Sequence, residues 1–348
     1  MPLATTLAAM LAASPVSLIA WSEGRAFPEE VGQTAVLELS DLTPAKPFNE
    51  AIVSWNISPA KGAHLTVEAR AKGEKTTKWY TLAEWQIDDH AQRVSVEKQK
   101  DEDGDVLTDT LRLKKPLSSL DLRLKLKRTV TGPTPVLRLV TVSTSDTLVR
   151  PASDFNPHPA WGKVVDVPQR AQGNYPRGGV LCSPTSLSMV LWHYANQLGR
   201  PELNKDVPEV EANVWDRVYD GAGNWPFNAA YAGSFDGIVS YVTRFRGIQD
   251  LEKWVEAGLP VICSVSLDVL KGSEKPRESG HLVVLVGFDA NGDPVFNDPA
   301  WREQVRRTYR RENFEQAWLT SSRTVYIVHP REAKVPQGGD GIWLQSGS

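Results

Sequence analysis

The sequence predicts a multidomain chain in which an antiparallel β-sandwich is followed by a domain of mixed helices and strands (α+β). Two observations carry this prediction. Between about residues 30 and 147, short stretches alternate apolar and polar residues and are separated by turn signals. After about residue 180 the apolar period lengthens to that of a helix, and further helices and strands follow. A length of 348 residues fits two or three domains of ordinary size.

The strands of the first half are predicted from the two-residue period of a pleated chain. In the segment 120–127 every leucine falls on one face and every charge on the other, and the segment 65–70 alternates in the same way. Such a pattern suits an antiparallel sheet with one side exposed to water. Several strands at this spacing predict a β-sandwich over residues 25–150. The further candidate strands are 51–57, 79–85 and 135–143.

The second half follows a linker at about 147–180 that is rich in Pro, Gly and Asn. Apolar residues from Leu187 to Tyr194 then recur at the spacing of an amphipathic helix that starts near Pro184. We therefore predict an α+β domain over residues 151–332. Its other predicted elements are a helix at 250–257 and strands at 261–265, 281–287 and 294–297.

The two ends of the chain are predicted to lie outside these domains. The first 20 residues are uncharged and rich in Ala and Leu, which predicts a signal peptide or a disordered N-terminus over residues 1–24. Ser17 and Ala20 suit a cleavage point, whereas Pro15 and the missing basic start argue against export. We predict an extracytoplasmic or secreted location, with the cytoplasm as the alternative. The Gly-rich segment 333–348 is predicted to be a flexible tail.

Composition and missing motifs argue against several classes of function. The 39 Lys and Arg residues nearly balance the 42 Asp and Glu residues, and a net charge of -3 does not favour a nucleic-acid partner. Two cysteines cannot build a disulfide scaffold or a four-thiolate zinc site. Dinucleotide, Walker and zinc-peptidase motifs are missing as well, so we expect neither a metal nor an organic cofactor. No later stretch is apolar enough to predict an integral membrane domain.

Cys182 is the first candidate for chemistry. It follows a Gly-rich loop and stands at the start of the predicted amphipathic helix. The N–H groups and the dipole at a helix N-terminus favour thiolate over thiol, which suits a nucleophile. The alternative is that Cys182 is only a small residue buried beneath the loop. The second cysteine, Cys263, lies in an apolar strand and is predicted to have no chemical role.

His281 and Asp298 are the candidate partners of this thiol. His281 opens a run of five apolar residues, where a histidine needs a partner or a function. If the following hairpin turns over residues 289–292, Asp298 lies opposite Val283, one diagonal step from His281. Diagonal neighbours are roughly 7–8 Å apart, so the carboxylate can hold one ring nitrogen while the other faces Cys182. The alternatives are a core histidine and a turn aspartate before a proline.

Three motifs in this half together resemble a known family. Cys-Ser-Pro-Thr-Ser stands at 182–186, Gly-His at 280–281 before an apolar strand, and Asn-Asp-Pro at 297–299. This order of Cys, His and Asp resembles a papain-like cysteine peptidase. The nearest resemblance is to the bacteriocin-processing (double-glycine-leader) peptidases, in a stand-alone form without a transporter. It covers roughly residues 161–330.

The resemblance implies roles for particular residues. Cys182 would be the nucleophile, His281 the base and Asp298 the group that orients the imidazole. The family has a glutamine before the cysteine that helps to line the oxyanion hole. Gln172 matches this position best, and Gln169 is the competitor. A serine at 183 replaces the glycine of many relatives, and this departure should leave the mechanism unaffected.

Two neighbouring residues are candidates for substrate binding. Trp225 lies beside Asn224 in a stretch that resembles a loop, and binding residues concentrate on loops. The alternative for Trp225 is a place in the core. Four aromatic residues of the first domain fit either a sandwich core or a carbohydrate or cell-wall contact, and they are Trp55, Trp79, Tyr80 and Trp85.

The predicted activity is that of a cysteine peptidase, which hydrolyses peptide (amide) bonds in a peptide or protein substrate through a thioester acyl-enzyme. Two alternatives stay open. The same residues would serve acyl transfer or amidase action on cell-wall peptides. A non-catalytic surface binding protein would keep the fold without the activity.

Overall fold

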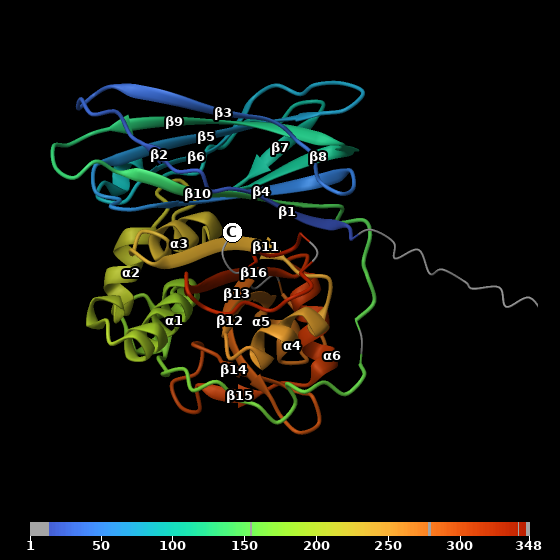
Figure 1. Ribbon diagram of the computed structural model, residues 1–348. Coiled ribbons are helices and arrows are strands. Elements are labelled where there is room, and N and C mark those ends of the chain that lie inside the picture. Colours follow the sequence, from blue (N-terminus) through green and yellow to red (C-terminus); the bar gives the residue numbers. More distant parts are fainter. Residues whose placement is uncertain (1–13, 154, 278–279, 340, 346–348) are drawn as a thin grey trace, which may run out of the picture.

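A computed structural model describes residues 14–153, 155–277, 280–339 and 341–345. Figure 1 shows a sheet-rich N-terminal domain lying above a C-terminal domain of mixed helices and strands. This two-domain architecture confirms the coarse prediction from the sequence. Within the described residues, no helix combines the length and the apolar character that are needed to cross a membrane.

The N-terminal domain consists of two antiparallel sheets. The first has the strand order β1-β10-β4-β8-β7, with β2 also paired to β10, and the second has the order β3-β9-β5-β6. Its strands are β1 (Val16–Trp21), β2 (Arg25–Ala26), β3 (Thr34–Leu42), β4 (Phe48–Ile57), β5 (Ala63–Lys72), β6 (Tyr80–Gln86), β7 (Gly104–Leu107), β8 (Thr110–Leu117), β9 (Ser119–Arg128) and β10 (Val136–Ser145).

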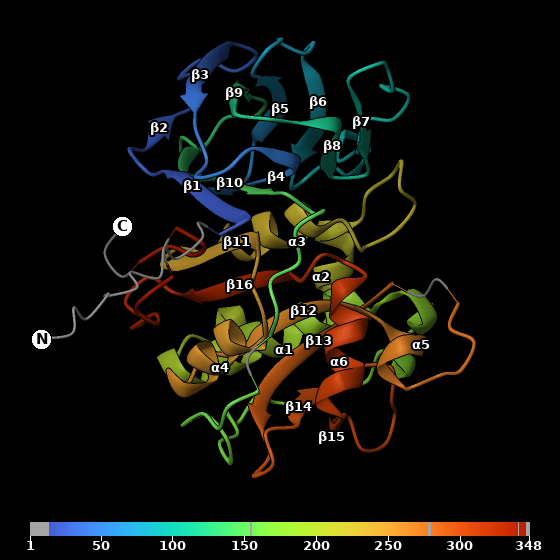
Figure 2. The ribbon, with the colours of Figure 1, turned by 90° about the vertical axis from the view of Figure 1, so that its right-hand side faces the viewer.

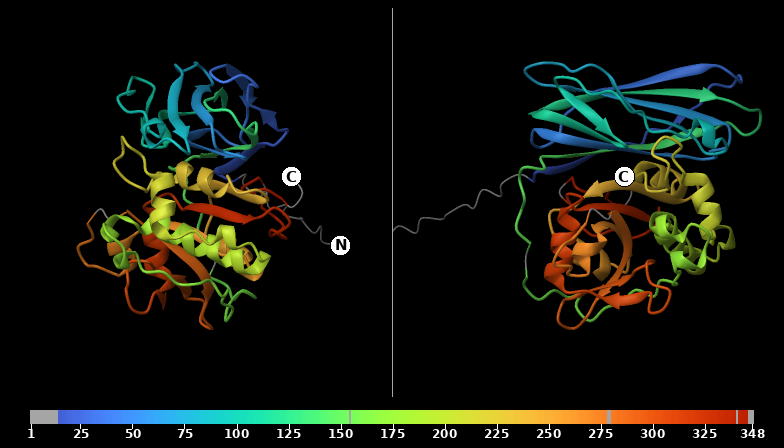
Figure 3. Two further views of the ribbon diagram at one scale, coloured as in Figure 1. Left: turned by 90° about the vertical axis from the view of Figure 1, so that its left-hand side faces the viewer. Right: turned by 180° about the vertical axis from the view of Figure 1, so that it is seen from behind.

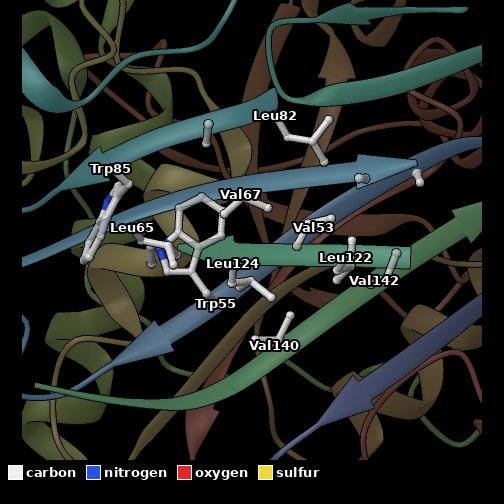
Figure 4. Close-up of a cluster of buried hydrophobic side chains, with 14 of the residues drawn as sticks. Val53, Trp55, Leu65, Val67, Leu82, Trp85, Leu122, Leu124, Val140 and Val142 are labelled. Atoms are coloured by element: carbon white, nitrogen blue, oxygen red, sulfur yellow. The ribbon is translucent and has the colours of Figure 1, made fainter. Parts of the chain in front are cut away.

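The alternation in β9 divides the sheet into a dry face and a wet face as expected. Leu122, Leu124 and Leu126 are buried and lie opposite apolar residues of β5. Arg123 and Lys125 on the other face bind Glu68. The apolar residues of both sheets meet in one core, in which Trp55 and Trp85 pack edge to face with ring centroids 6.1 Å apart (Figure 4).

The C-terminal domain is built on a six-stranded antiparallel sheet of the order β11-β16-β12-β13-β14-β15. Its strands are β11 (Ile238–Arg244), β12 (Val261–Ser266), β13 (Gly280–Phe288), β14 (Pro294–Asn297), β15 (Arg306–Thr308) and β16 (Thr324–Pro330). Its helices are α1 (Cys182–Leu198), α2 (Val207–Val214), α3 (Trp225–Ala232), α4 (Ile248–Glu256), α5 (Leu267–Leu270) and α6 (Arg311–Leu319).

Helices cover both faces of this sheet. The views from opposite sides show α1 in front of one face (Figure 3, left) and α4 and α6 in front of the other (Figure 2). Alternate residues of β13 follow this division, because Val284 and Val286 pack with the helix α1 and Val283 and Leu285 pack with α4 and α6. Because both faces of this strand are buried, apolar residues are favoured at every position. This explains the continuous apolar run after His281.

The N-terminal domain covers the open edge of the C-terminal sheet. The edge strand β11 lies against β4, where the amide of Asn56 donates to the Ser240 carbonyl (2.6 Å) and accepts from the Ser240 N–H (3.1 Å). Ser54 Oγ accepts from the Val242 N–H at 2.9 Å. A Cβ at Gly233 would lie 2.2 Å from Asn56 Nδ2, so only glycine fits there. These side chains replace a missing neighbour strand and join the domains.

The structure corrects the prediction for both chain ends. Residues 16–21, placed within the predicted leader 1–24, form the strand β1 and pair with β10. The remaining leader residues 1–13 lie outside the described residues. The predicted flexible tail 333–348 contains Trp343, which is 2% exposed and packs against Phe245. Burial of this indole ring fixes the backbone around Trp343, although the glycines of the segment predicted a flexible tail.

The aromatic residues of the first domain are core residues rather than a ligand surface. Trp55, Tyr80 and Trp85 are at most 1% exposed, so they cannot form the carbohydrate-binding face considered above. Of these four residues only Trp79 is partly exposed, and the guanidinium groups of Arg70 and Arg123 lie 4.7 and 4.3 Å from its ring centroid. Trp55 also packs on Phe227 of α3 with ring centroids 6.2 Å apart, which extends the sandwich core into the second domain.

Replacing Trp55 by Ala should destabilise the whole chain, because it empties a buried site shared by both domains. The expected cost is about 3–5 kcal/mol of unfolding free energy. Trp79→Ala is the matched control, and it should cost only about 1 kcal/mol, since its ring is partly exposed. Urea unfolding followed by circular dichroism measures both. Equal losses for the two variants would contradict the shared core.

Candidate active site

Cys182, His281 and Asp298 come together although the chain separates them widely. Cys182 is the first residue of α1, His281 is the second residue of β13, and Asp298 directly follows β14. His281 Nε2 and Asp298 Oδ1 are 2.7 Å apart, and the Cys182 thiol lies close enough to the same imidazole for each group to shift the pKa of the other. His281 is 3% exposed and Asp298 is fully buried, whereas Cys182 keeps partial access to solvent.

The register of the β13–β14 hairpin brings Asp298 to the histidine. The connecting loop spans residues 289–293, one residue longer than predicted, since Phe288 pairs with Pro294. An irregularity between Leu285 and Gly287 compensates, and Val284 then lies opposite Asn297. The next position therefore places Asp298 opposite Val283, as the sequence predicts. The assumed loop was too short, and the bulge restored the expected pairing.

The start of α1 is fastened to the sheet around Cys182. The hydroxyl groups of Ser183 and Tyr326 are 3.0 Å apart, and both residues are buried. Ser186 Oγ donates to the Leu282 carbonyl at 3.0 Å. These two bonds hold the first turn of the helix against β13 and β16. Ser183, expected to leave the site unaffected, thus anchors the residue beside the thiol.

The surroundings of Cys182 favour the thiolate. Burial raises the pKa of the thiol, but the hydrogen bond and the charge of His281 and the N–H groups of Leu282 and Ser183 outweigh it, so the pKa is lowered. For His281, burial acts to lower the pKa, and the bonds to Asp298 and Cys182 raise it to about 9. Both shifts act in the direction of a thiolate beside an imidazolium.

Asp298 is a buried carboxylate whose oxygens are all occupied. Its Oδ1 also accepts the Ala300 N–H at 2.9 Å, and its Oδ2 accepts the Tyr309 hydroxyl at 2.5 Å. Burial raises the pKa of Asp298, but the bonds and charge of His281, together with Tyr309 and the Ala300 N–H, lower it overall. The indole N–H of Trp301 donates to the Tyr309 oxygen at 3.1 Å.

Tyr309 is a site residue that the sequence analysis missed. It directly follows β15 in an Arg-rich stretch, where nothing in the sequence distinguishes its aromatic ring. The arginines there serve the fold: Arg306 donates to the Val167 carbonyl at 2.7 Å, and Arg311 pairs with Glu252 at 2.9 Å. A hydroxyl that holds a carboxylate leaves no pattern in one sequence, because the contact depends on strand pairing.

The two candidate glutamines differ in position. Gln172 is 8% exposed, and its N–H donates to the Pro299 carbonyl at 2.9 Å, next to Asp298. A Cβ at Gly178, in the loop that leads to Cys182, would lie 2.3 Å from the Gln172 carbonyl oxygen. The Gln172 backbone therefore contacts both the loop that leads to Cys182 and the loop that follows Asp298. Gln169 instead accepts the Arg306 N–H at 3.0 Å on the surface.

Asn224 does not fit its predicted part in substrate binding. It is 1% exposed and caps α3, with Oδ1 accepting the Phe227 N–H at 3.2 Å and Nδ2 donating to Asp216 at 2.9 Å. Its amide is buried and bonded within the fold, so a ligand has no access to it. Trp225 opens this helix, rather than a loop, and lines a cavity between the domains.

Other groups in the described residues take no part in the site. Cys263 is buried in β12, and burial raises its pKa well above the usual value, which leaves the thiol protonated. Within the described ranges no cluster of three or more His, Cys, Asp or Glu residues is placed to hold a metal ion. The chemistry that the site offers is therefore that of the thiol, the imidazole and the carboxylate.

A partly exposed thiol with a lowered pKa beside a histidine–carboxylate pair defines the thiol-dependent hydrolases as the class that fits this site. Comparison with protein families agrees. Residues 164–326 match the Peptidase_C39 like family, and residues 31–145 match the Peptidase C39 N-terminal domain. These two matches support a C39-type cysteine peptidase, with a C39 N-terminal domain preceding the Peptidase_C39 like region.

Other comparisons are weak. Among curated proteins none matches the chain. A structure of infectious bursal disease virus, Gx strain, is 12% identical with a TM-score of 0.22 and covers 37% of this chain and 32% of that chain. The catalytic domain of a GH87 alpha-1,3-glucanase is 12% identical with a TM-score of 0.17, and the match covers 46% of this chain and 32% of the glucanase chain. The chain spans about a third of either structure, and neither likeness carries an argument.

Iodoacetamide should modify Cys182 and spare Cys263 in the folded protein, because only Cys182 combines access with a lowered pKa. In the His281→Ala variant, burial still raises the pKa of Cys182, but the imidazole that lowers this pKa is gone. The pKa of Cys182 should rise, and the midpoint of the labelling rate against pH should move upward. Mass spectrometry of labelled peptides measures the rate. Labelling of Cys263, or an unmoved midpoint, would count against the described electrostatics.

Proposed function

We propose that this protein hydrolyses peptide bonds through a Cys182–His281–Asp298 triad set in a papain-like fold. The observation that carries the proposal is the 2.7 Å bond between the imidazole and a buried carboxylate, together with the mutual pKa shifts of that imidazole and the Cys182 thiol. The match of residues 164–326 to a peptidase family supports peptides or proteins as substrates. The helix and sheet arrangement, with the thiol at a helix start and the histidine on a strand, supports the papain-like assignment.

The proposed reaction begins from the thiolate and the imidazolium. Cys182 Sγ attacks the carbonyl carbon, and the carbonyl oxygen takes the electron pair. His281 Nδ1 then gives its proton to the leaving nitrogen, the carbon–nitrogen bond breaks, and a thioester and a free amine result. Nε2 faces Asp298 throughout, so the nitrogen that moves the proton is Nδ1. Asp298 stabilises the ring charge and keeps its orientation without taking the proton.

Water completes the cycle. His281 Nδ1 removes a proton from a water molecule, whose oxygen attacks the thioester carbon. The carbon–sulfur bond breaks, the carboxylic acid product leaves, and Cys182 returns as thiolate beside the protonated imidazole. A neutral imidazole is available for this step because the preceding transfer to the amine has deprotonated it. Every proton and electron pair is accounted for by the three residues, the substrate and one water.

We propose Gln172 as the side-chain donor of the oxyanion hole, together with the Cys182 N–H. Its position between the thiol loop and Pro299 supports this assignment. Its Oε1 has no hydrogen-bond partner in the described part of the chain, so the amide is not committed to the fold. The surface bond from the Arg306 N–H to the Gln169 side chain argues against the competitor.

The proposed activity is tested by cleavage-site profiling of a proteome-derived peptide library. The wild-type protein should generate new peptide ends at a consistent sequence pattern, whereas Cys182→Ala should generate none, because the attacking atom is gone. Cys263→Ala is the matched control and should cleave like the wild type. Added amine acceptors distinguish hydrolysis from acyl transfer, since transfer would place the amine on the new C-terminus. Cleavage by Cys182→Ala would refute the proposed nucleophile.

Removing the oxyanion donor should slow the chemical step more than it weakens binding. Gln172→Ala is expected to lower kcat by about 10²–10³-fold with little change in KM, since the donor acts on charge that develops during the reaction. Gln169→Ala provides the matched control and should retain kcat within about twofold, as the surface bond to Arg306 is worth little. Steady-state kinetics on a peptide found by profiling decides between them. A larger loss of kcat in Gln169→Ala than in Gln172→Ala would assign the oxyanion donor to Gln169.

A further inference from the structure

A cavity of about 550 Å³ lies between the two domains and next to the site. Gly280, which lines it, directly precedes His281, and Val265, which also lines it, pairs with His281 across β12 and β13. On the opposite side the wall comes from the N-terminal domain, through Glu50 of β4 and Arg112 of β8. The volume is within the range of pockets that bind ligands.

The charges of this cavity do not balance. Its lining contains three arginines and one carboxylate, which are Arg112, Arg244, Arg277 and Glu50. Glu50 bonds Arg244 through one oxygen at 2.5 Å and Arg112 through the other at 3.2 Å, so a single negative charge serves two guanidinium groups. Arg277 pairs outside the lining with Asp268. Among the lining residues one positive charge is left over, while the carboxylate of Asp109 lies behind the lining residue Trp225.

Arg112 is the group that can offer this charge to a ligand. Arg244 is almost fully buried and is held by Glu50 and by the hydroxyl groups of Ser145 and Thr324. The Arg112 side chain keeps about half of its surface exposed, at 51%. The ion pair with Glu50 engages only the Nε of Arg112, at 3.2 Å. A guanidinium can bind a further carboxylate through two parallel hydrogen bonds.

The N-terminal domain also sets the aromatic wall of the cavity. Asp109, in the turn between β7 and β8, is 8% exposed, and its Oδ2 accepts the Trp225 N–H at 2.8 Å. Trp225 is the first residue of α3 and keeps part of its ring exposed to the cavity. A flat apolar ring beside a guanidinium suits a peptide segment that carries an acidic side chain.

We infer that this cavity is a substrate subsite that both domains build together and that it takes an acidic residue of the peptide near the scissile bond. The inference rests on the proposed peptidase function and assigns a substrate class to the same site. Trp225 covers the peptide, and Arg112 binds the carboxylate. The N-terminal domain therefore takes part in selecting the substrate. This assigns to Trp225 the binding role that Asn224 does not have.

Binding to the Cys182→Ala protein tests this subsite without requiring cleavage. Two libraries are prepared from one protein digest, one with native carboxyl groups and one with these groups converted to amides. The immobilised protein should retain the native library with Asp and Glu enriched, and the amidated library should be retained about tenfold less. In the same background, Arg112→Glu should lower the enrichment about tenfold, because repulsion replaces attraction.

The control is Lys115→Glu, an equal change of charge at an exposed position of the same strand, which should retain the enrichment. Equal retention of the two libraries, no retention of either, or equal effects of Arg112→Glu and Lys115→Glu would overturn the subsite. The wild-type protein is then incubated with the retained peptides. Retention without cleavage would leave the subsite standing and remove the proposed peptidase function, so the two failures are distinguishable.

Discussion

The organisation of the site depends on one buried carboxylate. Asp298 is fully buried, yet its two oxygens accept hydrogen bonds from the imidazole, a hydroxyl and a backbone N–H. A buried charge is tolerated only when it is paired and hydrogen-bonded, so each donor must stay in place for the anion to persist. The anion in turn raises the pKa of His281, and the imidazole lowers the pKa of the Cys182 thiol. Asp298 is not among the causes given for the shift of the thiol, so its influence on Cys182 passes through His281.

The same logic of satisfied polar groups explains why the domains form one body. An edge strand presents unpaired N–H and C=O groups, and β11 would do so without a neighbour. Asn56 and Ser54 satisfy these groups from the N-terminal domain, and the buried pair of Glu50 and Arg244 crosses the same boundary. Because these contacts are polar and specific in geometry, they fix the orientation of the domains more tightly than an apolar surface would.

Periodicity alone located much of the fold. The two-residue alternation identified β5 and β9, and the helical spacing after Pro184 identified α1, which begins two residues earlier at Cys182. The pairing of Asp298 with His281 was also within reach, since it follows from strand register. Contacts between distant segments were not. The bond from Tyr309 to Asp298, the capping role of Asn224 and the burial of Trp343 each depend on tertiary packing. Local patterns carry no information about them.

The path of the last residues has a consequence for how such a chain can be divided. After β16 the backbone returns to β1, where the Gly341 carbonyl accepts the Leu18 N–H at 2.5 Å. Trp343 packs in the core of its own domain beside Phe245, and Val16 of β1 belongs to the same core. A cut at the linker would therefore take from the C-terminal half a strand that its core and its last residues contact. The two halves are therefore not interchangeable modules, and recombination that exchanges one half has to bring along its matching terminus.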